Sequence, residues 1–178
     1  DRGRIYRIVP KAQAGTVRAA RRPARLDRLA PSEWVAALDS PNGWQREMAQ
    51  QLLIWRNDRG AVAPLEAQIH LMLRSQLPRA AELLPHVRLS LGKCLKVQGS
   101  LRKALEVWTA ALHGLPVLPQ PVLTAELSMN IADAYRSLGE GDRAVAHARK
   151  ALSAARDARN LILEVEALRA LALALRDI

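Results

Sequence analysis

Apolar residues recur at helical spacing along most of the chain after residue 30, and polar or proline-containing breaks divide this pattern into segments. In the first segment Trp34, Val35 and Leu38 share one face, because residues three or four apart lie on the same side of a helix. The pattern predicts helices over residues 31–40, 44–56, 61–76, 84–99, 101–114, 124–139, 143–158 and 164–178.

The residue types that make up this pattern also favour helices. Leucine and alanine dominate the apolar residues, phenylalanine is absent, and only four tryptophans and two tyrosines are present. Leucine and alanine are strong helix formers, whereas strands prefer β-branched and aromatic residues. We therefore expect an all-α protein.

The helix expected over 44–56 has a defined start and one apolar stripe. Asn42 can cap its first turn, and Gln45 follows three residues later, as in a capping box. The stripe has spacings of four, four and three residues and consists of Trp44, Met48, Leu52 and Trp55. We interpret it as core between paired helices rather than as an aromatic platform for a ligand.

The second half of the chain repeats itself at a shift of forty residues. Large apolar residues align in two sets, which are Leu91, Ile131 and Leu171, and Leu95, Tyr135 and Leu175. Small residues align next to the first set, at Gly92, Ala132 and Ala172. A single helix hairpin cannot bury its apolar face, so the repeat predicts stacked antiparallel hairpins.

Each hairpin contains the residues that a tight connection between two helices needs. Two first helices end at Gly99 and Gly139, and glycine is the commonest residue just after a helix. Ser100 and Asp142 can cap the second helices. Those helices carry small residues at matching positions, namely Ala104, Ala111, Ala144 and Ala151.

These residues resemble the tetratricopeptide repeat over residues 84–178. Its unit has small residues at the eighth, twentieth and twenty-seventh positions and a large apolar residue at the eleventh. One unit is matched by Gly92, Leu95, Gly99, Ala104, Trp108 and Ala111, and a second by Ala132, Tyr135, Gly139, Ala144 and Ala151. Residues 159–178 resemble a first helix without its partner. The resemblance implies a right-handed α-solenoid of stacked antiparallel hairpins, similar to tetratricopeptide and HEAT proteins.

The N-terminal segment has a different pattern. Residues 4–9 alternate charged and apolar residues and predict a short strand, whereas residues 10–25 read as an extended linker. Residues 1–28 carry nine Lys or Arg against two Asp, and residues 29–178 carry eighteen against fifteen Asp or Glu. The basic character of the chain therefore belongs mainly to this leader.

We expect an extended leader followed by one helical-repeat domain. A basic leader covers residues 1–28, and a helical-repeat domain covers residues 29–178. Within the second, HEAT-like helices occupy residues 29–83 and tetratricopeptide-like repeats of about forty residues occupy residues 84–178.

Residues 1–58 resemble a junction in planctomycete-type propeller dehydrogenases and haem-binding proteins, where the last propeller strand leads into HEAT-like helices. The match rests on the string GRIYRIVP, on Pro41-Asn42-Gly43-Trp44, and on Arg46, Ala49, Gln50, Leu52 and Leu53. The resemblance implies an arm that follows a propeller in a longer, exported chain. It transfers no redox residue, because the sequence has no Cys-x-x-Cys-His. Ala30 stands where a capping Ser or Thr is expected, so the first helix should begin weakly.

We expect no active site, metal or cofactor in this chain. Its histidines are His70, His86, His113 and His147, and none is followed by a second metal ligand one turn later. Cys94 is the single cysteine and lies in an apolar helical pattern, which predicts a buried thiol. Asp133 stands alone, and no phosphate-binding loop or Gly-x-Ser-x-Gly is present. No uncharged apolar stretch reaches the length of a membrane span.

A recurring set of cations indicates a binding role. Lys96, Arg136 and Arg176 occupy one repeat position, forty residues apart. With their flanking residues they give the candidate partner-binding set, which is Lys93, Lys96, Asn130, Arg136, Arg169 and Arg176. In tetratricopeptide proteins the first helices line a concave groove, so the resemblance implies a groove for an acidic peptide. The alternative is a row of ordinary solvated cations.

These features support three hypotheses of function. The first is a non-catalytic protein–protein interaction scaffold whose partner is a protein or an acidic peptide. The second is a C-terminal accessory arm of an exported propeller-type dehydrogenase or haem-binding protein. The third is nucleic-acid binding through the arginine-rich leader, which we do not favour because the leader lacks the interleaved aromatics that stack bases. The cysteine content is compatible with either the cytoplasm or the periplasm.

Overall fold

The structure is a computed structural model of the 178-residue chain, and it describes residues 26–40, 42–56, 58–75, 78–115 and 120–178. All regular secondary structure within these ranges is helical, which confirms the all-α prediction. The strand expected over residues 4–9 and most of the expected leader lie outside the described residues.

Eight α-helices follow one another in the described part of the chain. They are α1 (Pro31–Ala37), α2 (Gly43–Arg56), α3 (Val62–Arg74), α4 (Pro78–Val97), α5 (Leu101–His113), α6 (Pro121–Ser137), α7 (Gly141–Asp157) and α8 (Leu161–Arg176). Two short 3-10 turns, η2 (Leu26–Arg28) and η3 (Arg59–Ala61), precede α1 and α3. Among these helices none combines the length and the apolarity that crossing a bilayer needs.

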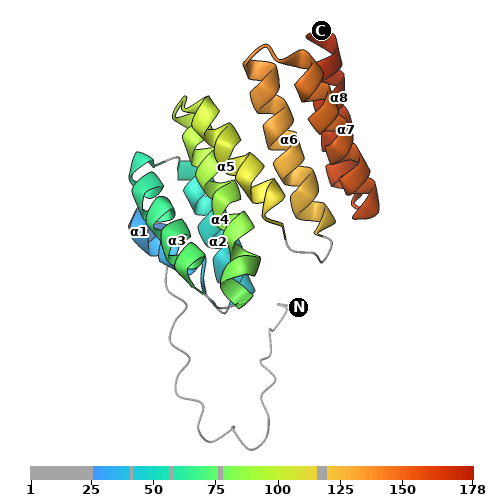
Figure 1. Cartoon of the computed structure of the whole chain (residues 1–178). Coiled ribbons are helices and arrows are strands. Elements are labelled where there is room, and N and C mark those ends of the chain that lie inside the picture. Colours follow the sequence, from blue (N-terminus) through green and yellow to red (C-terminus); the bar gives the residue numbers. More distant parts are fainter. Residues whose placement is uncertain (1–25, 41, 57, 76–77, 116–119) are drawn as a thin grey trace, which may run out of the picture.

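From α3 onward each helix packs against the next one along the chain, whereas α2 packs against α1 and α4, and α3 also packs against α1 (Figure 1). The two most complete hairpins are α4 with α5 and α6 with α7, and they correspond to the two forty-residue units of the sequence. Helix α5 also packs against α6, and α8 packs against both α7 and α6. The first helices of the three segments, α4, α6 and α8, therefore also contact one another in succession.

Glycine forms the turn of each hairpin, as predicted. Gly99 and Gly139 have φ of +80° and +75°, in the left-handed region that glycine adopts without strain. The amide after each glycine donates to a carbonyl five residues earlier, at 2.9 Å from Leu95 O and 2.9 Å from Tyr135 O. This is the Schellman arrangement, in which the turn satisfies the last carbonyls of the first helix.

The predicted caps of the second helices are wrong. Ser100 holds the N-cap position of α5, but its hydroxyl makes no capping hydrogen bond. Helix α7 starts after Glu140, so Asp142 lies within its first turn rather than at the cap. At the start of α1, Ala30 lacks a capping side chain, and the Glu33 carboxylate accepts the Ala30 N–H at 2.8 Å instead.

Helix α2 begins where the sequence predicts but turns a different face to the core. Asn42 accepts the amide of Trp44 at 3.1 Å, whereas Gln45 accepts from the Ser40 hydroxyl and forms no capping box. Trp44 and Trp55 are 55% and 71% exposed, so the predicted core stripe is wrong at its two tryptophans, although Leu52 packs against the core. The buried residues are Ala49 and Leu53. A small residue such as Ala49 permits the close approach of a neighbouring helix, whereas the tryptophans of the predicted stripe are too large for this contact.

The core is continuous across residue 84. Helix α4 begins at Pro78 and contains Pro85, so the helix expected to start at residue 84 starts one and a half turns earlier. The largest apolar cluster includes Trp34 of α1, Leu53 of α2, Trp108 of α5 and Ile131 of α6. Trp34, Val35 and Leu38 are buried together, as predicted.

Candidate functional site

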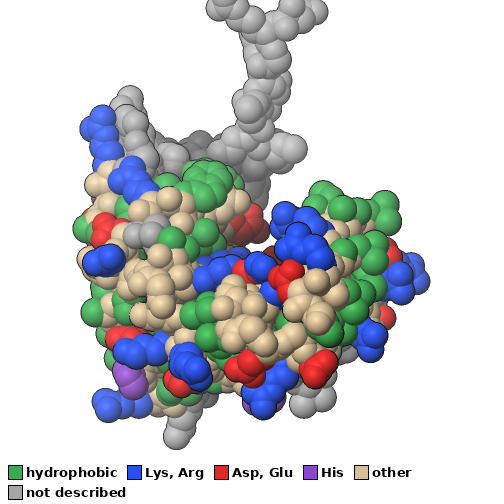
Figure 2. Space-filling view, turned by 90° about the horizontal axis from the view of Figure 1, so that it is seen from above, with side chains coloured by type: hydrophobic (Ala, Val, Ile, Leu, Met, Phe, Trp, Pro, Cys, Tyr) green, Lys and Arg blue, Asp and Glu red, His purple; other side chains and the backbone are tan. Residues whose placement is uncertain are grey.

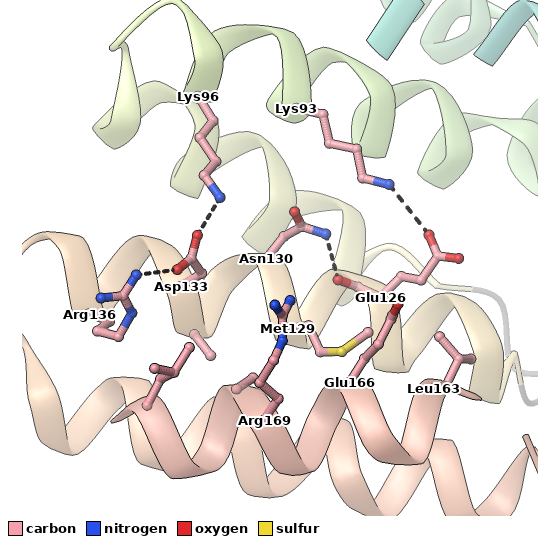
Figure 3. A pocket seen from close by; sticks show the side chains of 13 residues that line it. Lys93, Lys96, Glu126, Met129, Asn130, Asp133, Arg136, Leu163, Glu166 and Arg169 are labelled. Atoms are coloured by element: carbon pink, nitrogen blue, oxygen red, sulfur yellow. Dashed lines mark hydrogen bonds and ion pairs between the residues drawn. The ribbon is translucent and has the colours of Figure 1, made fainter. Parts of the chain in front are cut away.

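A pocket opens between α4, α6 and α8, the first helices of the three repeat segments. Its volume is about 400 Å³, and its walls include five of the six candidate residues, which are Lys93, Lys96, Asn130, Arg136 and Arg169. The two lysines point from α4 toward α6, and Arg169 rises from α8 toward α6 (Figure 3). The sixth candidate, Arg176, is not among the lining residues, and its Nε lies 3.0 Å from Asp177 Oδ1. We call this pocket the groove.

The groove contains acidic residues that the sequence interpretation missed. Figure 2 shows Asp and Glu side chains among the Lys and Arg side chains on the face seen from above. Four basic side chains in the groove face three acidic ones, namely Glu126, Asp133 and Glu166. The signal was present in the sequence, because Glu126 and Asp133 stand three or four residues from Asn130 and therefore share its helix face.

Asp133 is the centre of an ion-pair cluster. It accepts hydrogen bonds from Lys96 Nζ on α4 and, at 2.8 Å, from Arg136 Nη2 one turn along α6. Arg136 Nη1 also lies 3.2 Å from Asp177 Oδ2 just beyond α8. The expectation that Asp133 stands alone is therefore wrong. It links α6 to Lys96 of α4, and its partner Arg136 also pairs with Asp177 at the end of α8.

The protonation of this cluster follows from its geometry. Partial burial opposes the ionisation of Asp133, but the hydrogen bonds and charges of Lys96 and Arg136 outweigh it, so its pKa lies below the ordinary value. Hydrogen bonds to Asp133 and Asp177 raise the pKa of Arg136. The cluster is therefore fully charged at neutral pH. Asp133 already binds two of the cations that were expected to bind a partner, Lys96 and Arg136.

The other end of the groove is more open. Lys93 Nζ lies 3.6 Å from Glu126 Oε2, and Asn130 Nδ2 donates to the Glu126 backbone carbonyl at 2.8 Å. Among the residues that the structure describes, Arg169 has neither an ion pair nor a hydrogen bond to a side chain, and the same is true of Glu166 one turn earlier. Arg169 is therefore the groove cation most accessible to a ligand.

The floor of the groove is apolar. Met129 comes from α6, and Leu163, Ala170 and Leu173 come from α8. The groove therefore places charged side chains of both signs beside an apolar surface. The arrangement can hold a side chain that has an apolar stem and a carboxylate end.

Other reactive side chains are placed away from the groove. Cys94 is buried, its Sγ lies 3.7 Å from the Leu53 carbonyl, and burial raises the pKa of its thiol. His86 lies between α2, α4 and α6, and burial lowers its pKa. In the ranges that the structure covers, no group of three or more His, Cys, Asp or Glu side chains could hold a metal ion.

No family model matches this chain, and no curated protein matches it either. The resemblances to the tetratricopeptide repeat and to the propeller junction therefore stay predictions. Any assignment of function depends on the chemistry of the groove itself.

Proposed function

We propose that this chain is a non-catalytic protein–protein interaction scaffold that binds an acidic segment of a partner protein in the groove. The observation that carries this proposal is the convergence of five candidate residues from α4, α6 and α8 on one pocket. In this proposal the helices form a right-handed α-solenoid of tetratricopeptide-like hairpins, and the groove is its concave side. Such solenoids use concave surfaces lined by successive repeats to bind extended partners.

The packing inside the hairpins supports this type of solenoid. A Cβ atom at Gly92 would overlap the indole of Trp108, so α4 and α5 approach as closely as glycine allows. Trp108 is fully buried, and its Nε1 donates to the Leu89 carbonyl at 3.2 Å. The small residues of the second helices are also fully buried, at Ala104, Ala111, Ala144 and Ala151.

The groove cations divide into structural and exchangeable ones. Lys96 and Arg136 are held by Asp133, so a ligand carboxylate would have to displace two hydrogen bonds to reach them. The Lys93–Glu126 pair is longer and partly solvated, and such pairs stabilise a fold by only about 0–1 kcal/mol. A peptide carboxylate can therefore replace Glu126 at Lys93 and bind Arg169 directly.

Fluorescence anisotropy with a labelled peptide of alternating Glu and Leu tests this proposal. We expect Arg169→Ala to weaken binding by roughly 3- to 10-fold and added salt to weaken it further. Glu126→Gln should strengthen binding by a few fold, because it frees Lys93 and lowers the negative charge. A loss of folding would not produce such a gain.

Two controls make the experiment decisive. Arg149 is an exposed arginine on α7 outside the groove, so Arg149→Ala should leave the affinity unchanged. A peptide in which Gln replaces every Glu should bind much more weakly than the acidic one. The proposal is wrong if the two peptides bind equally, or if Arg169→Ala and Glu126→Gln both leave the affinity of the acidic peptide unchanged.

A further inference from the structure

Helix α8 has an apolar face directed away from the rest of the molecule. The exposed fractions of Leu161, Val165, Leu168 and Leu175 are 78%, 66%, 44% and 51%, and Ala172 lies exposed among them. The buried residues of α8 are on the opposite side, at Leu163, Ala167 and Ala174. We call the face formed by Leu161, Val165, Leu168, Ala172 and Leu175 the outer face. It does not line the groove.

The central residues of the corresponding face of α6 are buried. A shift of forty residues relates Val165, Leu168 and Ala172 to Ala125, Ser128 and Ala132. These three residues of α6 are 0%, 0% and 2% exposed, and Ala125 packs in one cluster with alanines of α7. The outer face is therefore a position at which this architecture packs a further helix.

The residue types of the outer face differ from those of α6 and indicate the kind of helix that fits. Alanine and serine on α6 allow the close approach of an alanine-rich helix. Leucine and valine on α8 project further and favour knobs-into-holes packing with a second set of leucines. The occupant is therefore expected to present large apolar residues rather than small ones.

The spacing on the outer face is that of a two-stranded coiled coil. Its residues are separated by four, three, four and three positions, which is a heptad seam. Leu161, Leu168 and Leu175 take the d positions, and Val165 and Ala172 take the a positions. In parallel coiled coils, leucine at d with a β-branched residue at a favours two strands over three or four. The same set of residues on a second copy is complementary to this seam.

The flanking charges favour the parallel orientation. Glu164 takes a g position and Arg169 the following e position, and in a parallel pair these positions of the two chains face each other. In an antiparallel pair the e positions face each other, so Arg169 would lie opposite the same arginine of the second copy. Glu164 now pairs with Arg156 at 2.8 Å, but this arginine is 60% exposed, so the pair costs little to exchange.

From these observations we propose that two copies of the chain associate in parallel through the outer face of α8. Helix α8 has 16 residues and is therefore about 24 Å long, which gives a contact at the small end of specific interfaces. We expect reversible dimers with a dissociation constant in the micromolar range, on the order of 1–100 µM. Because α8 is already folded against α6 and α7, dimerisation does not require a helix to form.

Sedimentation velocity of the 178-residue chain over roughly 1–300 µM tests the association. The wild-type chain should shift from monomer to dimer, and Leu168→Glu should remain a monomer at all concentrations. Leu71→Glu is the matched control, because Leu71 is a similarly exposed leucine on α3. The proposal is wrong if the wild-type chain is a monomer throughout, or if Leu168→Glu and Leu71→Glu behave alike.

Cysteine cross-linking tests the orientation. In a parallel pair the two residues at position 161 face each other, so Leu161→Cys should form an interchain disulfide on mild oxidation, while the buried Cys94 stays unreacted. Disulfides only between Leu161→Cys chains and Leu175→Cys chains would overturn the parallel arrangement. Because Arg169 serves both proposals, peptide binding is measured with the chain well below about 1 µM, where it is a monomer. Glu126→Gln should then strengthen peptide binding and leave dimerisation unchanged, so failure of one proposal leaves the other testable.

Discussion

Helices α6 and α8 have related sequences but different surroundings. On α6 the face formed by Ala125, Ser128 and Ala132 is buried, whereas the corresponding residues of α8 are exposed. Whether this face is buried depends on the presence of a neighbouring helix. The residue types on the face differ accordingly between α6 and α8. Small polar or apolar residues occur where another helix of the same chain packs, and large apolar residues occur where none of the described helices does.

The groove sides of the two helices differ in the same way. Asp133 of α6 corresponds to Leu173 of α8, and Glu126 corresponds to Glu166. The acids of α6 bind the lysines of α4, while Glu166 has no side-chain partner in the described ranges. Charge pairing therefore connects α4 to α6. The boundary between α6 and α8 has the Arg136–Asp177 pair at one end, and elsewhere it combines apolar side chains with Arg169 and Glu166, which have no side-chain partner in the described ranges.

The largest effect is expected where two helices approach most closely. Gly92→Ala would place a Cβ atom inside the Trp108 indole, which is fully buried and hydrogen-bonded and so cannot move freely. We expect a loss of about 3 kcal/mol in the free energy of unfolding, measured by urea denaturation. Gly43→Ala is the control, because its Cβ would contact only the Arg46 guanidinium at 3.6 Å. Equal effects of the two changes would contradict the proposed close packing.

The next effect compares α6 with α8 at one repeat position. Ala132 lines the groove but is only 2% exposed, so Ala132→Leu should overpack the surrounding helices and cost about 1–3 kcal/mol. Ala172 is exposed, so Ala172→Leu should change stability by less than about 0.5 kcal/mol. Urea denaturation of both variants at low protein concentration measures the difference. A similar loss for both would mean that the outer face of α8 is covered in the monomer.

The sequence predicted these contrasts only in part. Alignment at forty residues correctly placed Gly99 and Gly139 in the turns, and helical spacing correctly placed Trp34 and Cys94 in the core. Neither the alignment nor the spacing could show that the outer face of α8 is exposed. Exposure depends on which helices lie beside α8, and periodicity describes one helix at a time.

The sequence predicted which residues face the groove, but not that two of its cations are paired with an acid. Repeat register placed Lys96 and Arg136 on the same side of successive first helices, and the structure brings both to one pocket. Their neutralisation by Asp133 was missed, because a charged pair between two helices depends on the distance between them. The stripe on α2 failed for a related reason, since side-chain size does not show which face a neighbouring helix covers.

A smaller effect is expected at the buried hydroxyl of α6. Ser128 is fully buried, and its Oγ has no hydrogen-bond partner in the described part of the structure. Ser128→Ala should therefore stabilise the fold by about 1 kcal/mol in urea denaturation, because an unpaired buried polar group is costly. Ser90→Ala is the control, since Ser90 is equally buried but donates to the His86 carbonyl at 3.1 Å. We expect that change to destabilise the fold, and a gain from both would refute the distinction.

The smallest expected effect is a pH dependence of the free energy of unfolding that arises from His147, which packs on α6. His147 of α7 stacks on Tyr135 of α6 at 5.5 Å between ring centroids, and its Nδ1 is buried without a hydrogen-bond partner among the described residues. Burial lowers the pKa of His147, and the nearby charges of Lys150 and His113 lower it further.

The sign of this dependence follows from proton binding. Between the lowered pKa of the folded state and the unfolded value of about 6.5, the unfolded chain binds more protons, so stability should decrease as the pH falls below about 6.5. Urea midpoints at several pH values measure this slope, to which His86 also contributes. His147→Gln should flatten the slope in part, whereas His70→Gln, at an exposed position of α3, should leave it unchanged. If His147→Gln left the slope as steep as in the wild-type chain, the ring of His147 would not be desolvated by its packing on α6.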